Sequence, residues 1–182
     1  HRLKPVFVDI EWDTLNFDLD QVEAKITDKT RGIFISPVLG NPPDMDKLVE
    51  IAEKYNLKLI GDNCDSLGSK WNGKFLSEYY VAFSNSFYPA HHISTGEGGM
   101  ICTNNHEFYQ ICRALRSHGM TREMTDISMR QKLIDSNPDL NPDFIFLRPS
   151  HNFRSTEINA VIGLSQLKKL DAKNQERKYQ AC

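Results

Sequence analysis

The sequence predicts an α/β protein built around a mostly parallel β-sheet. Short apolar runs rich in β-branched residues alternate along the chain with segments whose apolar residues recur at helical spacing. This alternation is typical of parallel sheets, in which ligands collect at the carboxyl ends of the strands. With 182 residues, 40% of them hydrophobic, the chain can bury one sizeable core. Candidate functional residues are therefore sought where a predicted strand ends.

The first half of the chain alternates regularly between the two kinds of element. The predicted elements are a strand over residues 5–10, a helix over 18–26, a strand over 32–38, a helix over 44–55 and a strand over 57–62. Asp18 is the expected N-cap of the first helix, because its carboxylate can accept hydrogen bonds from the free amides of the first turn. The last of these strands ends in the acidic residue Asp62.

The second half contains a predicted hairpin, two strands and two helices. These are a hairpin over 69–75 that turns at Asn72-Gly73, strands over 81–87 and 98–104, a helix over 106–119 closed by Gly119, and a helix over 155–171 capped by Ser155 or Thr156. Residues 120–148 are polar and interrupted by prolines, and we expect a lid or an interface excursion there.

Composition argues against several classes of protein. A net charge of −2 gives no basic excess for nucleic acid, and no run approaches the roughly 18 apolar residues of a membrane helix. The four cysteines, Cys64, Cys102, Cys112 and Cys182, are too far apart for a disulfide framework, which favours a cytoplasmic location. The chain starts without Met and soon enters a predicted strand, so we expect a fragment of a longer protein.

Two carboxylates follow the strand 57–62. Asp62 is interpreted either as a cap of the next turn or as an anion that faces a cationic group of a ligand. Asp65, three residues later, could lie on the same side, and two such carboxylates repel unless a proton or a cation lies between them. No third ligand follows at a suitable spacing, so no metal site is predicted.

The loop "SFYPAHHISTGEGG", residues 86–99, connects the next two predicted strands. Ser84 and Ser86 are either exposed hydroxyls or, with backbone amides, part of a phosphate site. His91 and His92 could be solvated, could bind a metal, or could provide a general base with a pKa near neutrality. The residues alone indicate an α/β protein with a possible anion-binding catalytic loop.

Longer segments carry a more specific signal. "DMDKLVEIAEKYNLKLIGDNCDSLGSKWNGKF", "AFSNSFYPAHHISTGEGGMICTNN" and "RPSHNFRSTEINAVIGLSQLKKLD" resemble the DegT/StrS family of sugar-nucleotide aminotransferases. The resemblance covers nearly the whole chain and is weakest at 120–148. It implies the three-layer αβα large domain of aspartate aminotransferase-like PLP enzymes and a homodimer with shared sites. Residues 1–182 would be a fragment of that PLP-binding domain, without its N-terminal part or the small C-terminal domain.

The resemblance implies a role for each matching residue. Asp62 would pair with the pyridine nitrogen of PLP and keep the ring protonated as an electron sink. Asp65 stands near the cofactor's 3-hydroxyl, where the aminotransferases usually carry Gln or His. Ser86 would bind the cofactor phosphate, and Asn152 would reach the phosphate in the partner subunit.

One departure from the family pattern decides the expected reaction. The Schiff-base lysine of the family lies five residues after the phosphate-binding serine, where this chain has His91, and Lys70 and Lys74 flank the hairpin instead. Histidine at this position resembles the sugar-nucleotide 3-dehydratases of the family. The resemblance implies that PMP condenses with a 4-keto hexose, that His91 moves the proton at C4′ of the cofactor, and that the C3 hydroxyl leaves. His92 has no assigned role.

The same resemblance indicates the cofactors and the pathway. One dehydratase subtype holds an iron–sulfur cluster with clustered cysteines, which residues 113–181 lack, so no cluster is expected. The similar cluster-free enzyme acts on GDP-4-keto-6-deoxymannose, regenerates PMP with glutamate, and serves deoxysugar synthesis for O-antigen or other lipopolysaccharide. The alternatives are a sugar aminotransferase with an atypical base, or a non-catalytic family member. Retained cofactor anchors at Asp62 and Ser86 argue against the latter.

Overall fold

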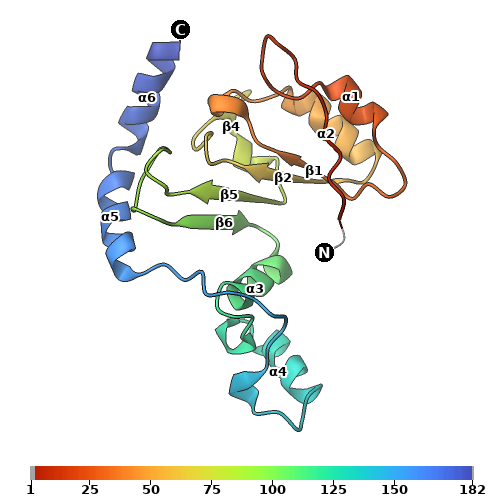
Figure 1. Ribbon diagram of the computed structural model, residues 1–182, viewed down its shortest axis with the longest axis vertical. Helices are drawn as coiled ribbons and strands as arrows, with labels where there is room; N and C mark the ends of the chain where they lie inside the picture. The colour runs from red at the N-terminus through yellow and green to blue at the C-terminus, as the bar shows by residue number, and fades with distance from the viewer. Residues whose placement is uncertain (1–2, 182) are drawn as a thin grey trace.

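The computed structural model describes residues 3–181, so Cys182 lies outside the described residues. A four-stranded sheet has the order β1-β2-β5-β6 (Figure 1). The strands are β1 (Gly32–Ile35), β2 (Lys58–Asp62), β5 (Ala82–Ser86) and β6 (Gly99–Thr103). The pairs β1–β2 and β2–β5 are parallel and β5–β6 is antiparallel. The predicted α/β class with a mostly parallel sheet is confirmed.

The hydrophobic core lies between the first half of the sheet and two helices, α1 (Leu19–Ala24) and α2 (Met45–Lys54). Asp18 caps α1 as predicted, and Asp44 caps α2. Met45 and Leu48 of α2 are fully buried against Ile35 of β1. Burying one such side chain contributes about 1.5–3 kcal/mol to stability. Apolar side chains on the opposite face of the sheet, such as Phe34, are exposed among the described residues.

A small hairpin follows β2, as predicted. It consists of β3 (Lys70–Trp71) and β4 (Lys74–Phe75), joined by Asn72 and Gly73. Both turn residues have positive φ angles, 47° and 82°, which is the type I′ geometry that Asn-Gly favours.

The strand predicted for residues 5–10 is wrong. This segment forms only a single bridge between Ile10 and Phe17, and Val6 and Phe7 are exposed. A segment of strand-forming residues needs a neighbouring strand to complete its hydrogen bonds, and the described residues supply none there. The strand predicted for 32–38 ends early, at Ile35, because Pro37 has no amide to donate.

Helix α3 (His106–Leu115) covers part of the region predicted as helix over 106–119. His118 and Gly119 then take positive φ angles, 60° and 86°, and the amide of Gly119 donates to the carbonyl of Ala114. Residues 120–148 contact α3 through Thr121–Glu123 and include α4 (Ile127–Asp135). Short 3-10 helices occur at Val38–Gly40, Leu76–Glu78, Thr121–Glu123 and Pro142–Phe144.

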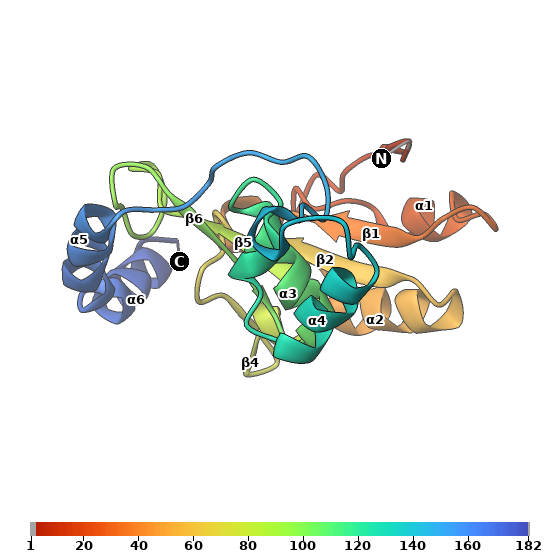
Figure 2. The same ribbon diagram turned by 90° about the horizontal axis from the view of Figure 1, so that it is seen from below.

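The helix predicted over 155–171 is two helices in the structure. Thr156 caps α5 (Glu157–Leu167), and α6 (Leu170–Ala181) follows after a short break. Both views place α5 and α6 on the side of the sheet that is remote from α1 and α2 (Figure 1, Figure 2). Much of the apolar side chain surface of α5 is exposed. No helix within residues 3–181 has the length and apolar character needed to cross a membrane.

Candidate active site

The sheet register brings the predicted site residues Asp62 and Ser86 to the carboxyl ends of adjacent strands. Asp62 ends β2 opposite Ser84 of β5, so these two side chains leave the same face of the sheet. Ser86, two residues after Ser84, points to that face as well. The Asp62 carboxylate accepts hydrogen bonds from the Ser84 hydroxyl and from the amide of Cys64, each 3.1 Å long. The structure therefore places Asp62, Ser84 and Ser86 together at the carboxyl ends of neighbouring strands, and their role as a site stays a prediction.

Cys64 lies next to this carboxylate and is held in its neutral form. Burial, and after it the hydrogen bond to Asp62, raise the pKa of the Cys64 thiol to about 11. Because the thiolate is the reactive form, this cysteine is a poor nucleophile near neutral pH.

Ser86 opens the loop that leads to the histidines. Its hydroxyl oxygen accepts a hydrogen bond from the amide of Tyr88 at 3.1 Å, which leaves the hydroxyl proton able to donate. The amide of Phe87 donates to the carbonyl of Gly98, and the amide of Thr95 donates to the carbonyl of Phe87. These bonds close the base of the loop and fix its two ends side by side.

His91 and Asp65 form a direct contact between the two loops. Nδ1 of His91 lies 2.9 Å from Oδ1 of Asp65, and the two side chains are 22% and 52% exposed. The amide of His91 also donates to the carbonyl of Tyr88, which fixes the turn that carries the ring. Within the described part of the chain, no group of three or more His, Cys, Asp or Glu residues could hold a metal ion.

His92 differs from its neighbour. Its Nδ1 is buried and has no hydrogen-bond partner among the described residues. Burial, and after it the positive charge of Arg177 on α6, lower the pKa of His92. The two histidines therefore occupy different environments: His91 pairs with a carboxylate, whereas His92 is held neutral.

Asn152 is not brought together with the other candidates. It forms a backbone bridge with Ser117, just beyond α3, and its Oδ1 accepts from the backbone amide and Nε of Arg154. The side chain makes no hydrogen bond to Asp62, Ser86 or His91. Its expected contact, with the cofactor phosphate in a partner subunit, stays a prediction.

Two asparagines outside the predicted site bond its loops to the C-terminal helices. Nδ2 of Asn174, on α6, donates to the carbonyl of Leu67 at 2.9 Å. Nδ2 of Asn159, on α5, donates to the carbonyls of Thr95 and Glu97 at 2.8 and 3.3 Å. These partners are 62 to 107 residues apart in sequence, so no local pattern could have revealed them.

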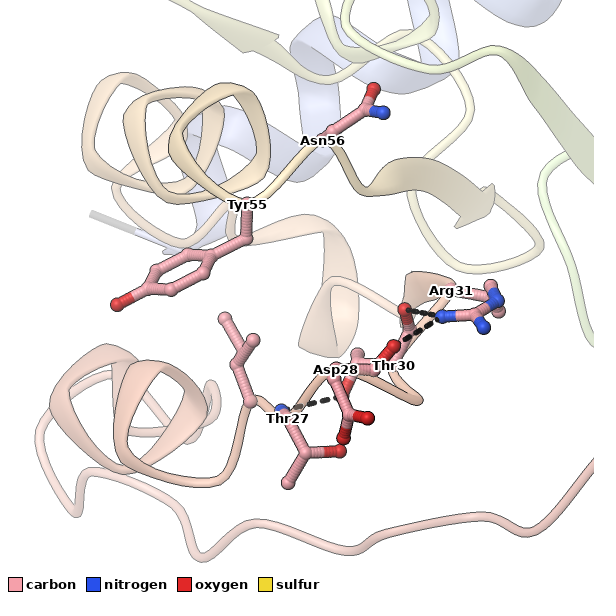
Figure 3. Close-up of a pocket in the computed structure, with 7 residues that line it drawn as sticks. Thr27, Asp28, Thr30, Arg31, Tyr55 and Asn56 are labelled. Carbon is pink, nitrogen blue, oxygen red and sulfur yellow. Dashed lines mark hydrogen bonds between the residues drawn. The ribbon is translucent and has the colours of Figure 1, made fainter.

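A separate surface hollow lies at the other end of the strands, where β1 and β2 begin. Its volume is about 510 Å³, and it is lined by residues 26–28, 30–31 and 55–56, which precede β1 and β2 (Figure 3). Within it, Nη1 of Arg31 donates to the backbone carbonyls of Asp28 and Thr30. None of the predicted site residues lines this hollow.

Comparison with known proteins places this geometry in a family. The model of the DegT/DnrJ/EryC1/StrS aminotransferase family matches residues 1–181. GDP-4-keto-6-deoxy-D-mannose 3-dehydratase of Yersinia pseudotuberculosis is 40% identical over 166 residues, which cover 90% of this chain and 42% of the relative. The dTDP-4-dehydro-2,6-dideoxy-D-glucose 3-dehydratase of Saccharopolyspora spinosa is 36% identical over 177 residues, covering 93% and 38%.

Solved structures agree with these sequence matches. GDP-4-keto-6-deoxymannose-3-dehydratase with a trapped PLP-glutamate geminal diamine superposes with a TM-score of 0.77 at 33% identity, covering 91% of this chain and 42% of that structure. The chain thus spans about two-fifths of the length of these relatives. The family match over residues 1–181, together with the strand-end site and the shared fold, shows that this chain belongs to the DegT/DnrJ/EryC1/StrS aminotransferase family.

Proposed function

We propose that this chain is part of a PLP/PMP-dependent sugar-nucleotide 3-dehydratase, which removes the C3 oxygen of a 4-keto-6-deoxyhexose nucleotide. It would form part of the large PLP-binding domain of that enzyme. The observation that carries the proposal is His91, which stands five residues after Ser86, where the family resemblance places a Schiff-base lysine. A neighbouring carboxylate holds the imidazole, so the residue is oriented and not simply solvated.

The residues at the strand ends fit the cofactor. The Asp62 carboxylate is held through one oxygen by Ser84 and Cys64, which leaves the other oxygen able to face a protonated ring nitrogen. Ser86 offers a hydroxyl donor on the same face of the sheet, suited to a phosphate. Asn152 would contact the phosphate of a partner's site in a homodimer. When bound in its amine form, the cofactor supplies an electron sink for loss of the C3 oxygen.

His91 would move the proton that this chemistry requires. A neutral imidazole accepts and returns a proton near neutral pH. Unlike a lysine amine, it cannot capture the cofactor covalently and so drive a completed amino transfer. Asp62 would orient the ring, and Ser86 would hold the phosphate, so that the transferred proton meets His91.

Electron balance identifies the co-substrate class. Replacement of the C3–O bond by C–H is a two-electron reduction, which oxidation of glutamate to 2-oxoglutarate with release of ammonia would supply. The relative trapped as a PLP-glutamate adduct supports glutamate in this role. Relatives that act on GDP- and dTDP-linked sugars leave the nucleotide open. A cytoplasmic homodimer that supplies deoxysugars for cell-surface polysaccharide, such as O-antigen, agrees with this chemistry.

The direct test is incubation of the complete enzyme with PMP, glutamate and GDP-4-keto-6-deoxymannose, followed by mass spectrometry of the sugar nucleotide. We expect a product without the C3 oxygen and one 2-oxoglutarate for each product formed; omission of PMP is the control. A 4-amino product would overturn the proposal in favour of a sugar aminotransferase with an atypical base. If GDP-, CDP- and dTDP-linked 4-keto sugars all stay unchanged, a non-catalytic family member is favoured.

A further inference from the structure

We propose that Asp65 is a positioning residue for His91. Its carboxylate accepts the proton on Nδ1 and leaves Nε2 as the basic atom of the imidazole. This inference rests on the proposed function, in which His91 moves a proton. It gives Asp65 a role that differs from the contact with the cofactor's 3-hydroxyl implied by the family resemblance.

The geometry assigns the tautomer. An ionised carboxylate can only accept hydrogen bonds, so the 2.9 Å contact between Oδ1 of Asp65 and Nδ1 of His91 requires a proton on Nδ1. In a neutral imidazole, the other nitrogen then carries the lone pair. Among residues 3–178, whose side chains the structure describes, the His91 ring bonds only through Nδ1, which leaves Nε2 to accept a proton. The carboxylate also stabilises the imidazolium that forms when Nε2 takes that proton.

Both partners come from fixed loops, which makes the pairing inexpensive in conformational entropy. On the Asp65 side, the Ser66 hydroxyl donates to Oδ1 of Asn63 at 3.1 Å, and the Leu67 carbonyl accepts from Asn174. On the His91 side, the backbone turn at Tyr88 fixes the residue. The carboxylate therefore meets the ring without either loop having to be ordered first.

The burial of the pair also matches this role. The His91 side chain is largely shielded at 22% exposure, whereas Asp65 is 52% exposed. The carboxylate of Asp65 is reached by water, and it contacts a ring that is largely withdrawn from water. Asp65 is thus suited to orient the imidazole, and its replacement should not disturb the core.

The decisive readout is the tautomer of His91, measured on the chain itself. Long-range 1H–15N correlation of protein labelled with 15N-histidine, with His91→Gln used to assign the ring among the six histidines, shows which nitrogen carries the proton. We expect the proton on Nδ1 in the wild type and a shift toward Nε2 in Asp65→Ala. Asp65→Glu should restore at least part of the Nδ1 form. Asp139→Ala, which removes an exposed carboxylate in a turn, is the matched control and should change nothing.

Kinetics and binding of the complete enzyme separate positioning from cofactor contact. Asp65→Ala should lower kcat about 10- to 100-fold, less than loss of the base itself, with little change in KM or in the Kd for PMP. A wild-type His91 with its proton on Nε2, or a tautomer that Asp65→Ala leaves unchanged, overturns the inference. Weaker PMP binding without a tautomer change would instead assign Asp65 to the cofactor. A correct tautomer in an enzyme without dehydratase activity refutes the proposed function and leaves the pairing supported.

Discussion

Asn174 on α6 donates a hydrogen bond to the carbonyl of Leu67, 107 residues earlier, and so ties the C-terminal helix to the loop that carries Asp65. The bond is 2.9 Å long and partly buried. Gly68, the next residue, has a φ angle of 93°, and a Cβ there would collide with the Asn174 side chain. The close approach of the helix to this loop therefore depends on a glycine and an amide together.

Removal of this bond should loosen the Asp65 loop. Asn174→Ala leaves the Leu67 carbonyl without its donor, and we expect a loss of about 0.5–1.5 kcal/mol in the free energy of unfolding. Hydrogen–deuterium exchange should accelerate in residues 63–69. Gln175→Ala, at an exposed position on the same helix, is the control. Equal exchange in both variants would show that α6 does not hold the loop.

Asn159 should have the corresponding effect on the His91 loop. Its Nδ2 donates to the carbonyls of Thr95 and Glu97, while its Oδ1 accepts from Thr156 in the capping box of α5. Asn159→Ala removes both sets, so we expect a loss of about 1–2 kcal/mol and faster exchange in residues 87–98. Ser165→Ala, exposed on the same helix, controls for helix propensity. Faster exchange limited to α5 would contradict a role in the loop.

The parts of this site that were predictable follow from strand periodicity. Asp62 and Ser86 each end a strand, and the carboxyl ends of neighbouring parallel strands lie together whatever the paths of the loops. The pairing of His91 with Asp65 was not predictable, because it depends on the paths of two irregular loops 26 residues apart. Each residue could be singled out from its own position in the sequence, but no local pattern indicated that the two side chains are in contact.

Two predicted elements differ from the structure in ways that local sequence patterns do not report. The run at 5–10 has strand composition, but strand formation depends on a partner that propensity does not report. The long helix predicted over 155–171 splits between Leu167 and Leu170, although no proline or glycine marks the break. The exposed apolar surface of α5 likewise shows that helical periodicity does not by itself establish burial within this chain.

Cys64 should resist alkylation near neutral pH. Because burial and Asp62 raise its thiol pKa to about 11, little thiolate is present at pH 8, and the thiolate fraction grows only as the pH rises toward that value. Iodoacetamide labelling followed by peptide mass spectrometry should show Cys64 far less modified at pH 8 in folded protein than in protein unfolded in urea. Comparable labelling in the two states would show that the fold does not shield Cys64.

His92 should make the fold sensitive to mild acid. Its pKa is lowered by burial and by Arg177, so the unfolded chain binds a proton at a higher pH than the folded chain does. The stability from neutral His92 is present above its unfolded pKa of about 6.5 and is lost as the pH falls through the lower folded value. Urea unfolding at pH 7.5 and 5.5 should therefore show a larger loss for the wild type than for His92→Gln. Parallel losses would exclude His92 as the origin.

His91 should be required for turnover but not for cofactor binding. His91→Asn keeps a polar side chain, although a smaller one, and removes the group that accepts and returns the proton, so we expect dehydration to fall by about 10²- to 10⁴-fold. PMP binding, followed by its absorbance or by protein fluorescence, should stay within about twofold, because Asp62 and Ser86 are the proposed anchors. His151→Asn, an exposed histidine outside the loop, is the matched control. Undiminished turnover in His91→Asn would remove this residue from the mechanism, whereas joint loss of PMP binding would show that it holds the cofactor instead.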